Sequence, residues 1–438
     1  MNDLTQGKPS RVMVRFALPI ALGNIFQLCY SLADTRVVGS TLGMTSLAAV
    51  GATTSISTLF IGFLSGLTNG FAILVAREYG AGRKDGVKRF AAESLTLGVA
   101  TALAFTVVCV TFLPFLLRIL NVPEELTREA TSYIRVVLAG LTATLAYNAC
   151  AGILRAVGDT TAALLFLICA SFLNIGLDLL FILVFHMGVG GAALATVLSQ
   201  TVSAVASFLY MQKRYEMFRF RLPDFRVNRE DARELYASGL SMAAMMSFVF
   251  FGTLALQCAI NTFGEDTIVA HTAARKITEF FMLPFSVMSA TMATYCSQNA
   301  GAGKMDRVRG GIRQALLLTW GWSVGTIILS YTVSPQMIRM VTGTDKLAVI
   351  QTAALYLKVD TLFYFAPAAI AVLRNALQGL GEHRIPVYSS FIELAGKVAV
   401  ALFLTPVFHY WGIIVAEPVV WLVMVIPLVV KIRAMLWL

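Results

Sequence analysis

Twelve stretches of mostly apolar residues follow one another along the 438-residue chain, and each is long enough to cross a lipid bilayer. A helix needs about 20 apolar residues to span the hydrocarbon core of a membrane. The stretches are continuous runs rather than short alternating segments, so they indicate helices and not the strands of a barrel. We therefore predict an all-α integral membrane protein with twelve transmembrane helices, at residues 12–38, 46–75, 90–116, 127–154, 160–185, 190–212, 233–262, 267–297, 311–334, 348–374, 385–408 and 412–432.

The composition argues against a soluble enzyme. Hydrophobic residues make up 58% of the chain and charged residues 13%, whereas soluble domains carry about 25% charged residues. The six cysteines lie in or beside apolar runs without a CxxC pair, and none of the four histidines belongs to a metal-ligand pair. We expect the cysteines to act as small buried hydrophobic side chains, and we predict no enzymatic activity and no cofactor.

Lysines and arginines gather on one side of this twelve-span arrangement. The most basic loops join the second and third spans (77–89) and the sixth and seventh spans (213–233), and both termini carry basic residues on the same side. Since basic loops mark the cytoplasmic side, both termini are predicted to be cytoplasmic in a multi-pass protein of the cytoplasmic (inner) membrane. Anionic lipid headgroups then account for the net charge of +10, and nucleic acid is not an expected partner.

The chain contains an internal repeat with an offset of about 220 residues. VAREYGAGRKDGV at 75–87 is echoed by CSQNAGAGKMDRV at 296–308, and GILRAVGDT at 152–160 by NALQGLGEH at 375–383. Each copy holds six spans, so the two copies enter the membrane in the same sense. Parallel repeats of this kind are typical of transporters that alternate access. The predicted organisation is an N-lobe at 1–212, a basic linker at 213–232 and a C-lobe at 233–438.

A few acidic residues lie inside the spans, where they are costly to bury and mark ion or proton pathways. Asp34 lies in the first span and Asp178 in the fifth, with Asn174 one helical turn before Asp178. At 1.5 Å per residue, these two acids, Tyr133 and Thr196 lie roughly 8 to 11 Å below the outer face of the membrane. The four groups therefore share one layer of the N-lobe, either as an ion site or as a hydrogen-bond cluster that holds helices together.

Two neighbouring carboxylates in a low-dielectric site cannot both be charged without a large energetic cost. The pair is therefore expected to take up a proton, unless a sodium ion supplies the balancing charge. Asn174, Thr196 and Tyr133 offer the neutral oxygens and hydrogen bonds that such a site needs. Pro19, in the first span, removes a backbone hydrogen bond and weakens the helix. It is either a hinge that responds to the ion or a static kink.

The paired loops YGAGRKD and NAGAGKMD, the turn LRAVGDT and the spans with Asp34 and Asn174/Asp178 resemble the multidrug and toxic compound extrusion (MATE) family. This resemblance covers nearly the whole chain. It implies a two-lobe fold of twelve helices that exports organic cations and other amphiphilic drugs in exchange for protons or sodium ions. It also implies a small-molecule antiporter rather than an enzyme, and we expect it to act as a monomer.

Within the family, the chain resembles the DinF-like branch. The resemblance implies a cation site at Asp34, Tyr133, Asn174, Asp178 and Thr196, with possible sodium ligands at Asp34, Asn174, Asp178 and Thr196. It also implies polar cavity residues at Gln27 and Asn148 and a bending proline at Pro19. A second branch uses acids of the seventh and tenth spans, but here the seventh has no acid between Gly239 and Thr262, and Asp360 falls outside the matching register.

Other readings stay open. Glu393 and Lys397, which echo Asn174 and Asp178, are expected to form an internal salt bridge or else to contact substrate, and Lys276 with Glu279 invites the same pair of interpretations. A flippase of lipid-linked precursors is the alternative function, although such a protein would line its cavity with several arginines. Whether the coupling ion is a proton or sodium stays open.

Overall fold

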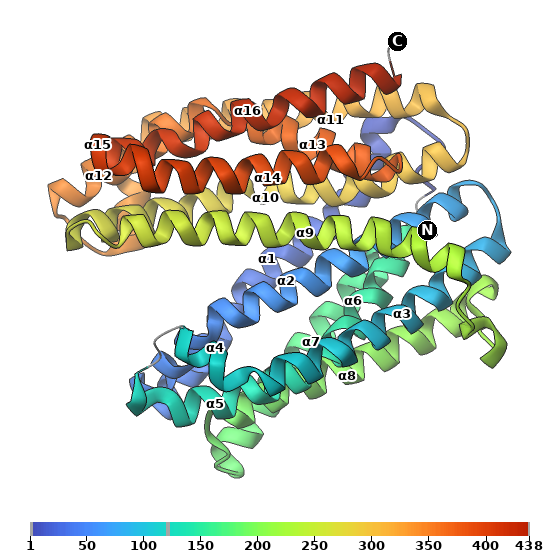
Figure 1. The fold of residues 1–438 in the computed structure, drawn as a ribbon, viewed down its shortest axis with the longest axis horizontal. Coiled ribbons are helices and arrows are strands. Elements are labelled where there is room, and N and C mark those ends of the chain that lie inside the picture. Colours follow the sequence, from blue (N-terminus) through green and yellow to red (C-terminus); the bar gives the residue numbers. More distant parts are fainter. Residues whose placement is uncertain (1–2, 120–122, 437–438) are drawn as a thin grey trace. The chain divides into compact units, whose positions relative to one another are not determined.

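The computed structural model describes residues 3–119 and 123–436, and within these ranges it contains helices and no strand (Figure 1). In chain order the α-helices are α1 (Pro9–Leu42), α2 (Met44–Gly80), α3 (Lys84–Thr111), α4 (Leu113–Ile119), α5 (Glu124–Ala139), α6 (Leu141–Ala156), α7 (Thr160–Leu179), α8 (Gly188–Arg214), α9 (Arg229–Ile260), α10 (Glu265–Gly301), α11 (Met305–Thr342), α12 (Leu347–Leu362), α13 (Phe365–Gly379), α14 (Arg384–Ala399), α15 (Thr405–Phe408) and α16 (Tyr410–Leu436). Short π-helices, η1 (Leu180–Val184) and η4 (Val400–Leu404), extend α7 and α14, and 3-10 helices η2 (Glu216–Phe218) and η3 (Leu222–Phe225) follow α8.

These helices confirm the predicted all-α membrane fold. Among the described residues, nine helices are long and apolar enough to cross a membrane, and two bent pairs raise the number to eleven. The pairs are α5 with α6, bent by 45°, and α12 with α13, bent by 51°. The 37-residue α10 covers the remaining predicted span. It is less apolar because its first half carries five charged residues, Glu265, Asp266, Arg275, Lys276 and Glu279, and its second half contains several Ser and Thr. Each predicted stretch thus corresponds to one helix, one bent pair or one helix with a short extension.

The chain forms two compact units whose boundaries fall inside helices. Unit 1 consists mainly of Leu18–Ala243, and unit 2 consists of Leu4–Ala17 and the chain after Ala243. The first boundary therefore lies within α1, directly before Pro19, although α1 remains helical through the proline. Of the candidate spans, α1 has the smallest buried share, 17% of its apolar window against 56% for α2. A helix with so little buried surface loses few contacts if it moves.

Matching backbone features show that the sequence repeat is also a structural repeat. The π-helices η1 and η4 follow equivalent helices in the two halves of the chain. Residues with positive φ recur in pairs with nearly equal angles, namely Gly82 (71°) with Gly303 (70°), Gly158 (85°) with Gly381 (84°), and His186 (51°) with His409 (52°). The GAG motifs therefore serve as tight turns in both halves, since glycine tolerates this left-handed conformation.

The second GAG motif also holds the start of the chain in unit 2. The Asn299 Nδ2 donates to the Leu4 carbonyl at 3.1 Å, and the Arg307 Nη1 donates to the Gly7 carbonyl at 2.7 Å. Both side chains come from the repeat segment 296–308. The N-terminal residues are thus fixed by specific hydrogen bonds before α1 passes into unit 1.

The basic segment 213–232 packs on α3 within unit 1. The Thr96 hydroxyl donates to the Phe225 carbonyl at 3.3 Å, and the Lys88 Nζ lies 2.6 Å from the Asp224 carboxylate. The hydrogen bond from Lys88 holds the pKa of the Asp224 carboxyl below its ordinary value. This segment is therefore attached to α3 rather than extended as a free tether.

Small residues allow α2 and the first part of α9 to approach closely within unit 1. A Cβ added at Gly70 would come within 2.5 Å of the Gly239 Cα, and the Ser238 hydroxyl donates to the Gly70 carbonyl at 2.8 Å. Such small-residue contacts are a common way for membrane helices to associate, because lipid offers no hydrophobic force between them.

We expect Gly70→Val to lower the free energy of unfolding by about 1–3 kcal/mol or more, because the new side chain would overpack this crossing. Gly62→Val is the matched control, since a Cβ at Gly62 of the same helix meets nothing within 4 Å. Both variants should be unfolded with a denaturing detergent and compared with wild type. Equal stability of the two variants would contradict the importance of the crossing.

Candidate cation site in unit 1

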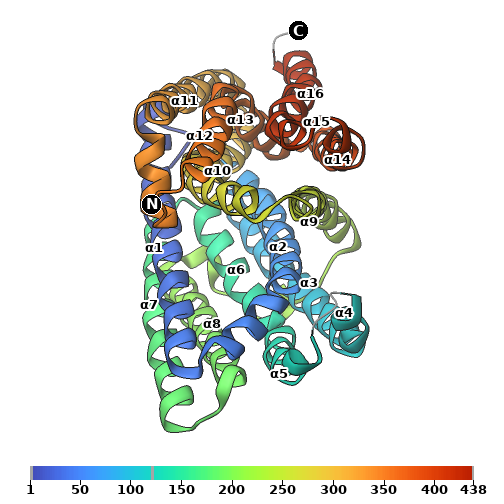
Figure 2. The same ribbon diagram turned by 90° about the vertical axis from the view of Figure 1, so that its left-hand side faces the viewer.

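Unit 1 brings together the predicted cation-binding residues from four helices. Asp34 lies on α1, Tyr133 on α5, Asn174 and Asp178 on α7, and Thr196 on α8. Helices α7 and α8 pack side by side (Figure 2). The carboxyl groups of Asp34 and Asp178 lie within hydrogen-bonding reach of each other. Asp178 is fully buried, and Asp34 is partly exposed.

Asn174 connects Asp178 to the neighbouring helices. In the amide orientation that satisfies its surroundings, its Nδ2 donates to the Asp178 Oδ2 at 3.2 Å and to the Tyr30 hydroxyl. Its Oδ1 accepts from the Thr196 backbone N–H at 2.9 Å and from the Thr196 hydroxyl at 3.3 Å. One amide thus joins α1, α7 and α8 through side-chain hydrogen bonds, which are worth more where water cannot compete.

Tyr30 is a member of this cluster that the sequence analysis missed. It lies four residues before Asp34 on α1, so both side chains project from the same helix face. This spacing is the signal that could have identified it. Tyr133, on α5, lies close enough to Asp34 and Asp178 to interact with their charges. Two tyrosine hydroxyls therefore stand beside the pair of acids.

Among the described residues, the two acids have no basic partner to neutralise them. In the described part of the chain, no lysine or arginine forms an ion pair with Asp34 or Asp178. The Asp178 Oδ1 is buried and has no hydrogen-bond partner among the described residues. A buried carboxylate in this state is costly unless a proton or a cation compensates it. The hydroxyl oxygens of Tyr30 and Thr196 are neutral groups of the kind that a sodium ion or a protonated carboxyl needs, whereas the Asn174 oxygen already accepts two hydrogen bonds from Thr196.

A small polar cavity of unit 1 contains the other residues that the resemblance implied. Pro19, Gln27 and Asn148 all line this cavity, whose volume is about 140 Å³. The Asn148 Nδ2 donates to the Ser65 hydroxyl at 3.2 Å, which fixes the amide on the cavity wall. Drug-sized ligands need about 300–1,000 Å³, so the cavity in this conformation has room for water or for part of a ligand. Helix α1 contributes to both this cavity and the pair of acids, because Asp34 follows Gln27 by two helical turns.

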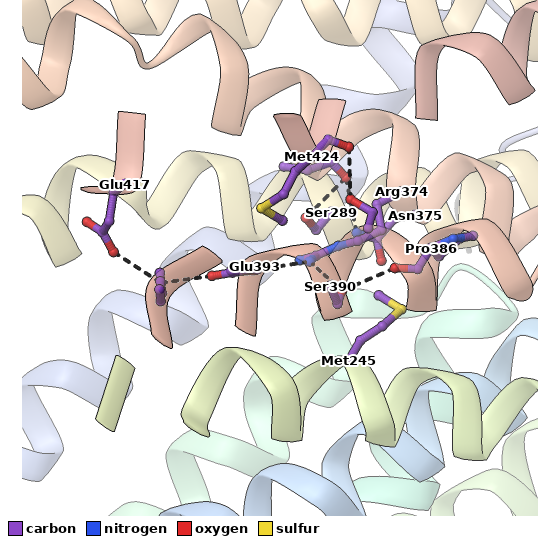
Figure 3. A network of polar contacts seen from close by, with 12 residues as sticks. Met245, Ser289, Arg374, Asn375, Pro386, Ser390, Glu393, Glu417 and Met424 are labelled. Carbon is purple, nitrogen blue, oxygen red and sulfur yellow. Dashed lines mark hydrogen bonds and ion pairs between the residues drawn. The ribbon is translucent and has the colours of Figure 1, made fainter. Parts of the chain in front are cut away.

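The acids of unit 2 have a different environment (Figure 3). The Lys397 Nζ lies 2.9 Å from the Glu393 Oε1 and 3.2 Å from the Glu417 Oε1, and the Arg275 Nη1 lies 2.8 Å from the Glu417 Oε2. The expected Glu393–Lys397 pair is thus part of a longer network. Sequence reasoning missed Glu417 and Arg275 because they lie on α16 and α10, far from the pair in the chain.

Basic groups lie beside both glutamates of this network. Arg374 lies 4.0 Å from Glu393 and donates to the Ser390 hydroxyl at 3.1 Å. Asp360 is fully buried, lies within hydrogen-bonding reach of Tyr364 and interacts with the charges of Glu417, Arg275 and Lys397. Glu393 and Glu417 are therefore paired with positive charges of unit 2 itself.

The Lys276–Glu279 pair lies outside both clusters. Its side chains are 64% and 55% exposed, and the charged atoms are 3.5 Å apart within one turn of α10. An exposed pair of this kind contributes little to stability, and it has no place in either buried cluster.

Comparisons with known proteins agree with this fold. A family model described as MatE matches residues 19–180 and 241–403. The chain is 25% identical over 415 residues to the probable multidrug resistance protein YoeA of Bacillus subtilis, with 92% of this chain and 89% of that protein covered. Crystal structures of MATE in the bent and the straight conformation both match with a TM-score of 0.88 and 26% identity. The match to the bent structure covers 98% of this chain and 97% of the other chain. The match to the straight structure covers 99% of this chain and 98% of the other chain.

The buried network of unit 2 predicts a large effect of removing one charge. We expect Glu417→Gln to lower the free energy of unfolding by about 3–5 kcal/mol, because it removes the ion-pair partner of Arg275 and leaves Lys397 with Glu393 alone. Glu279→Gln is the matched control on an exposed pair, and it should change stability by less than about 1 kcal/mol. Denaturing-detergent titrations of both proteins make the comparison, and similar losses in the two variants would argue against the network.

Proposed function

The chain belongs to the MatE family, and we propose that it is a cation-coupled antiporter that exports amphiphilic, often cationic, organic compounds. It is an integral multi-pass membrane protein and a multidrug efflux transporter rather than an enzyme. Our proposal adds that protons or sodium ions drive export, and that the protein works as a monomer of the cytoplasmic membrane with both termini in the cytoplasm. No cofactor besides the coupling ion is required.

One observation carries this proposal, namely the contact between Asp34 and Asp178 without a basic partner in the described part of the chain. A proton shared by the carboxyls, or a sodium ion between them, allows the two groups to approach. When the ion leaves, the two negative charges repel each other and favour separation of the side chains. Ion binding is thereby linked to the position of α1 relative to α7 within unit 1.

Pro19 offers a means to convert this link into movement. The proline removes one backbone hydrogen bond of α1, and the helix is the least buried of the candidate spans. We propose that α1 bends at Pro19 when the ion at Asp34 changes. Gln27, on the same helix, would move with it and change the volume of the cavity. The two MATE structures named for bent and straight conformations are in keeping with this idea.

The substrate would bind where this cavity enlarges. Its wall presents the carboxamides of Asn24, Gln27 and Asn148 beside apolar residues, which suits an amphiphilic compound. Arg155 also lines the cavity, so a cationic compound is favoured on the side toward Asp34, where the acids two turns from Gln27 attract positive charge. Competition between substrate and coupling ion for these acids would then give exchange.

We expect Asp34→Asn to reduce ion-driven transport of a fluorescent cation by about 5- to 150-fold, the range that corresponds to a coupling free energy of 1–3 kcal/mol. Asp345→Asn is the control, because that side chain is 92% exposed in a loop of unit 2. Transport should be measured in proteoliposomes under a proton gradient and a sodium gradient separately, which also identifies the ion. Undiminished transport by Asp34→Asn would disprove the proposed site.

The hinge predicts a different kinetic defect. Pro19→Ala restores the missing backbone hydrogen bond and stiffens α1, so substrate binding should persist while the turnover rate falls. Pro284→Ala, in the middle of α10, controls for the general effect of replacing a helical proline. Binding by equilibrium dialysis and turnover in proteoliposomes separate the two steps. A Pro19→Ala protein with wild-type turnover would show that the proline is a static kink.

A further inference from the structure

The polar cavity of unit 1 has a basic side chain on its wall. Among the described lining residues, Arg155 is the only one with a charged side chain. It lies in the last turn of α6, and Asn148, which also lines the cavity, precedes it by two turns. Charged side chains within membrane helices usually mark a functional site. Neither ion exchange at Asp34 nor bending at Pro19 requires this arginine, and its charge repels the cations that the acids attract.

No acid in the described part of the chain forms an ion pair with Arg155. Its Nη2 donates at 3.2 Å to the Asn69 Oδ1, which is a neutral acceptor. The carboxylate of Asp159, four residues later, is used elsewhere. Its Oδ1 accepts from the Ala162 backbone N–H at 3.0 Å, and its Oδ2 accepts from the Tyr215 hydroxyl at 2.5 Å. A guanidinium group without a counter-charge in a membrane protein favours the binding of an anion.

A second group without a partner lines the same cavity. Thr160 is the first residue of α7, only the turn 156–159 separates it from Arg155 in the chain, and it is 2% exposed. Its hydroxyl has no hydrogen-bond partner among the described residues. A buried hydroxyl without a partner costs free energy, and it is able to donate to an anion. Asp178, eighteen residues further along α7, is about 27 Å of helix away, so its carboxyl does not satisfy this hydroxyl.

We propose that Arg155 and Thr160 form a subsite for a carboxylate group of the exported compound, an inference that rests on the proposed export function. The guanidinium would donate two parallel hydrogen bonds to the carboxylate, and the Thr160 hydroxyl would donate a third. The cavity volume of about 140 Å³ has room for such a group in this conformation. One guanidinium matches the single charge of a carboxylate. The protein therefore binds an amphiphile with both an amine and a carboxylate more tightly than the ester of the same compound.

A matched pair of fluorescent dyes tests the subsite. Rhodamine B carries a carboxylate beside its cationic ring system, and its ethyl ester has the same ring system without the negative charge. In equilibrium dialysis with the full-length protein in detergent, the acid should bind about tenfold more tightly than the ester, which cannot make the charge-assisted hydrogen bonds. The assay uses no ion gradient, so its outcome does not depend on coupling at Asp34. Equal affinity for the two dyes would overturn the subsite and leave the export function standing, whereas binding of neither dye would overturn both.

Three variants assign the preference to these residues. Arg155→Gln should weaken rhodamine B binding by about tenfold, while the ester should bind at least as tightly as it does to the wild type. Thr160→Val removes the hydroxyl at nearly constant volume and should weaken rhodamine B binding by about threefold, which keeps a test available if Arg155→Gln does not fold. Arg219→Gln is the control, because this exposed side chain does not line the cavity, and it should keep the wild-type preference.

The ester separates a direct contact from a structural role of Arg155. An arginine that only holds α6 in place would affect both dyes alike when it is replaced. Equal loss of the two dyes in a folded Arg155→Gln protein, or a wild-type preference in both Arg155→Gln and Thr160→Val, would refute the assignment.

Discussion

The buried carboxyl of Asp178 and the partly exposed carboxyl of Asp34 meet from different helices of unit 1, and neither has a basic partner among the described residues. In a medium of low dielectric this arrangement is stable only with a bound proton or cation. Other features of unit 1 bear on this requirement. Asn174 joins Asp178 to Thr196 of α8, the weakly buried α1 carries Asp34, and Pro19 weakens that helix close to a boundary of the unit.

The two halves of the repeat solve the problem of buried charge in different ways. Asn174 and Asp178 in α7 correspond to Glu393 and Lys397 in α14, and both helices end in a π-helix. In unit 2 the positive charge belongs to side chains of the protein itself. Lys397 pairs with Glu393, and Arg275 of α10 pairs with Glu417. A fixed internal charge cannot leave, so it stabilises one arrangement of the helices. In the proposed function, an exchangeable ion at Asp178 would allow two arrangements, as alternating access needs.

Sequence reasoning could predict features that depend on position along a helix. The spans followed from length and apolarity, and the common depth of Asp34, Asp178, Tyr133 and Thr196 followed from the rise per residue. It could not predict which helix faces meet, because rotation and neighbour choice depend on packing. Tyr30 and the Glu417–Arg275 contact were missed for that reason. The bend between α5 and α6 was missed as well. Gly140 at this bend lies against Val197 of α8, which leaves no space for a side chain, and the sequence does not show that contact.

The central claim is that substrate and coupling ion exclude each other at Asp34 and Asp178. Ion release upon substrate binding tests it most directly, with purified protein in weakly buffered solution and with electrodes for protons and for sodium. The account predicts that the wild type releases about one proton or one sodium ion per bound substrate, and that the Asp34→Asn, Asp178→Asn double variant releases neither. Substrate binding to the wild type without release of either ion, or equal release by the double variant, would contradict it.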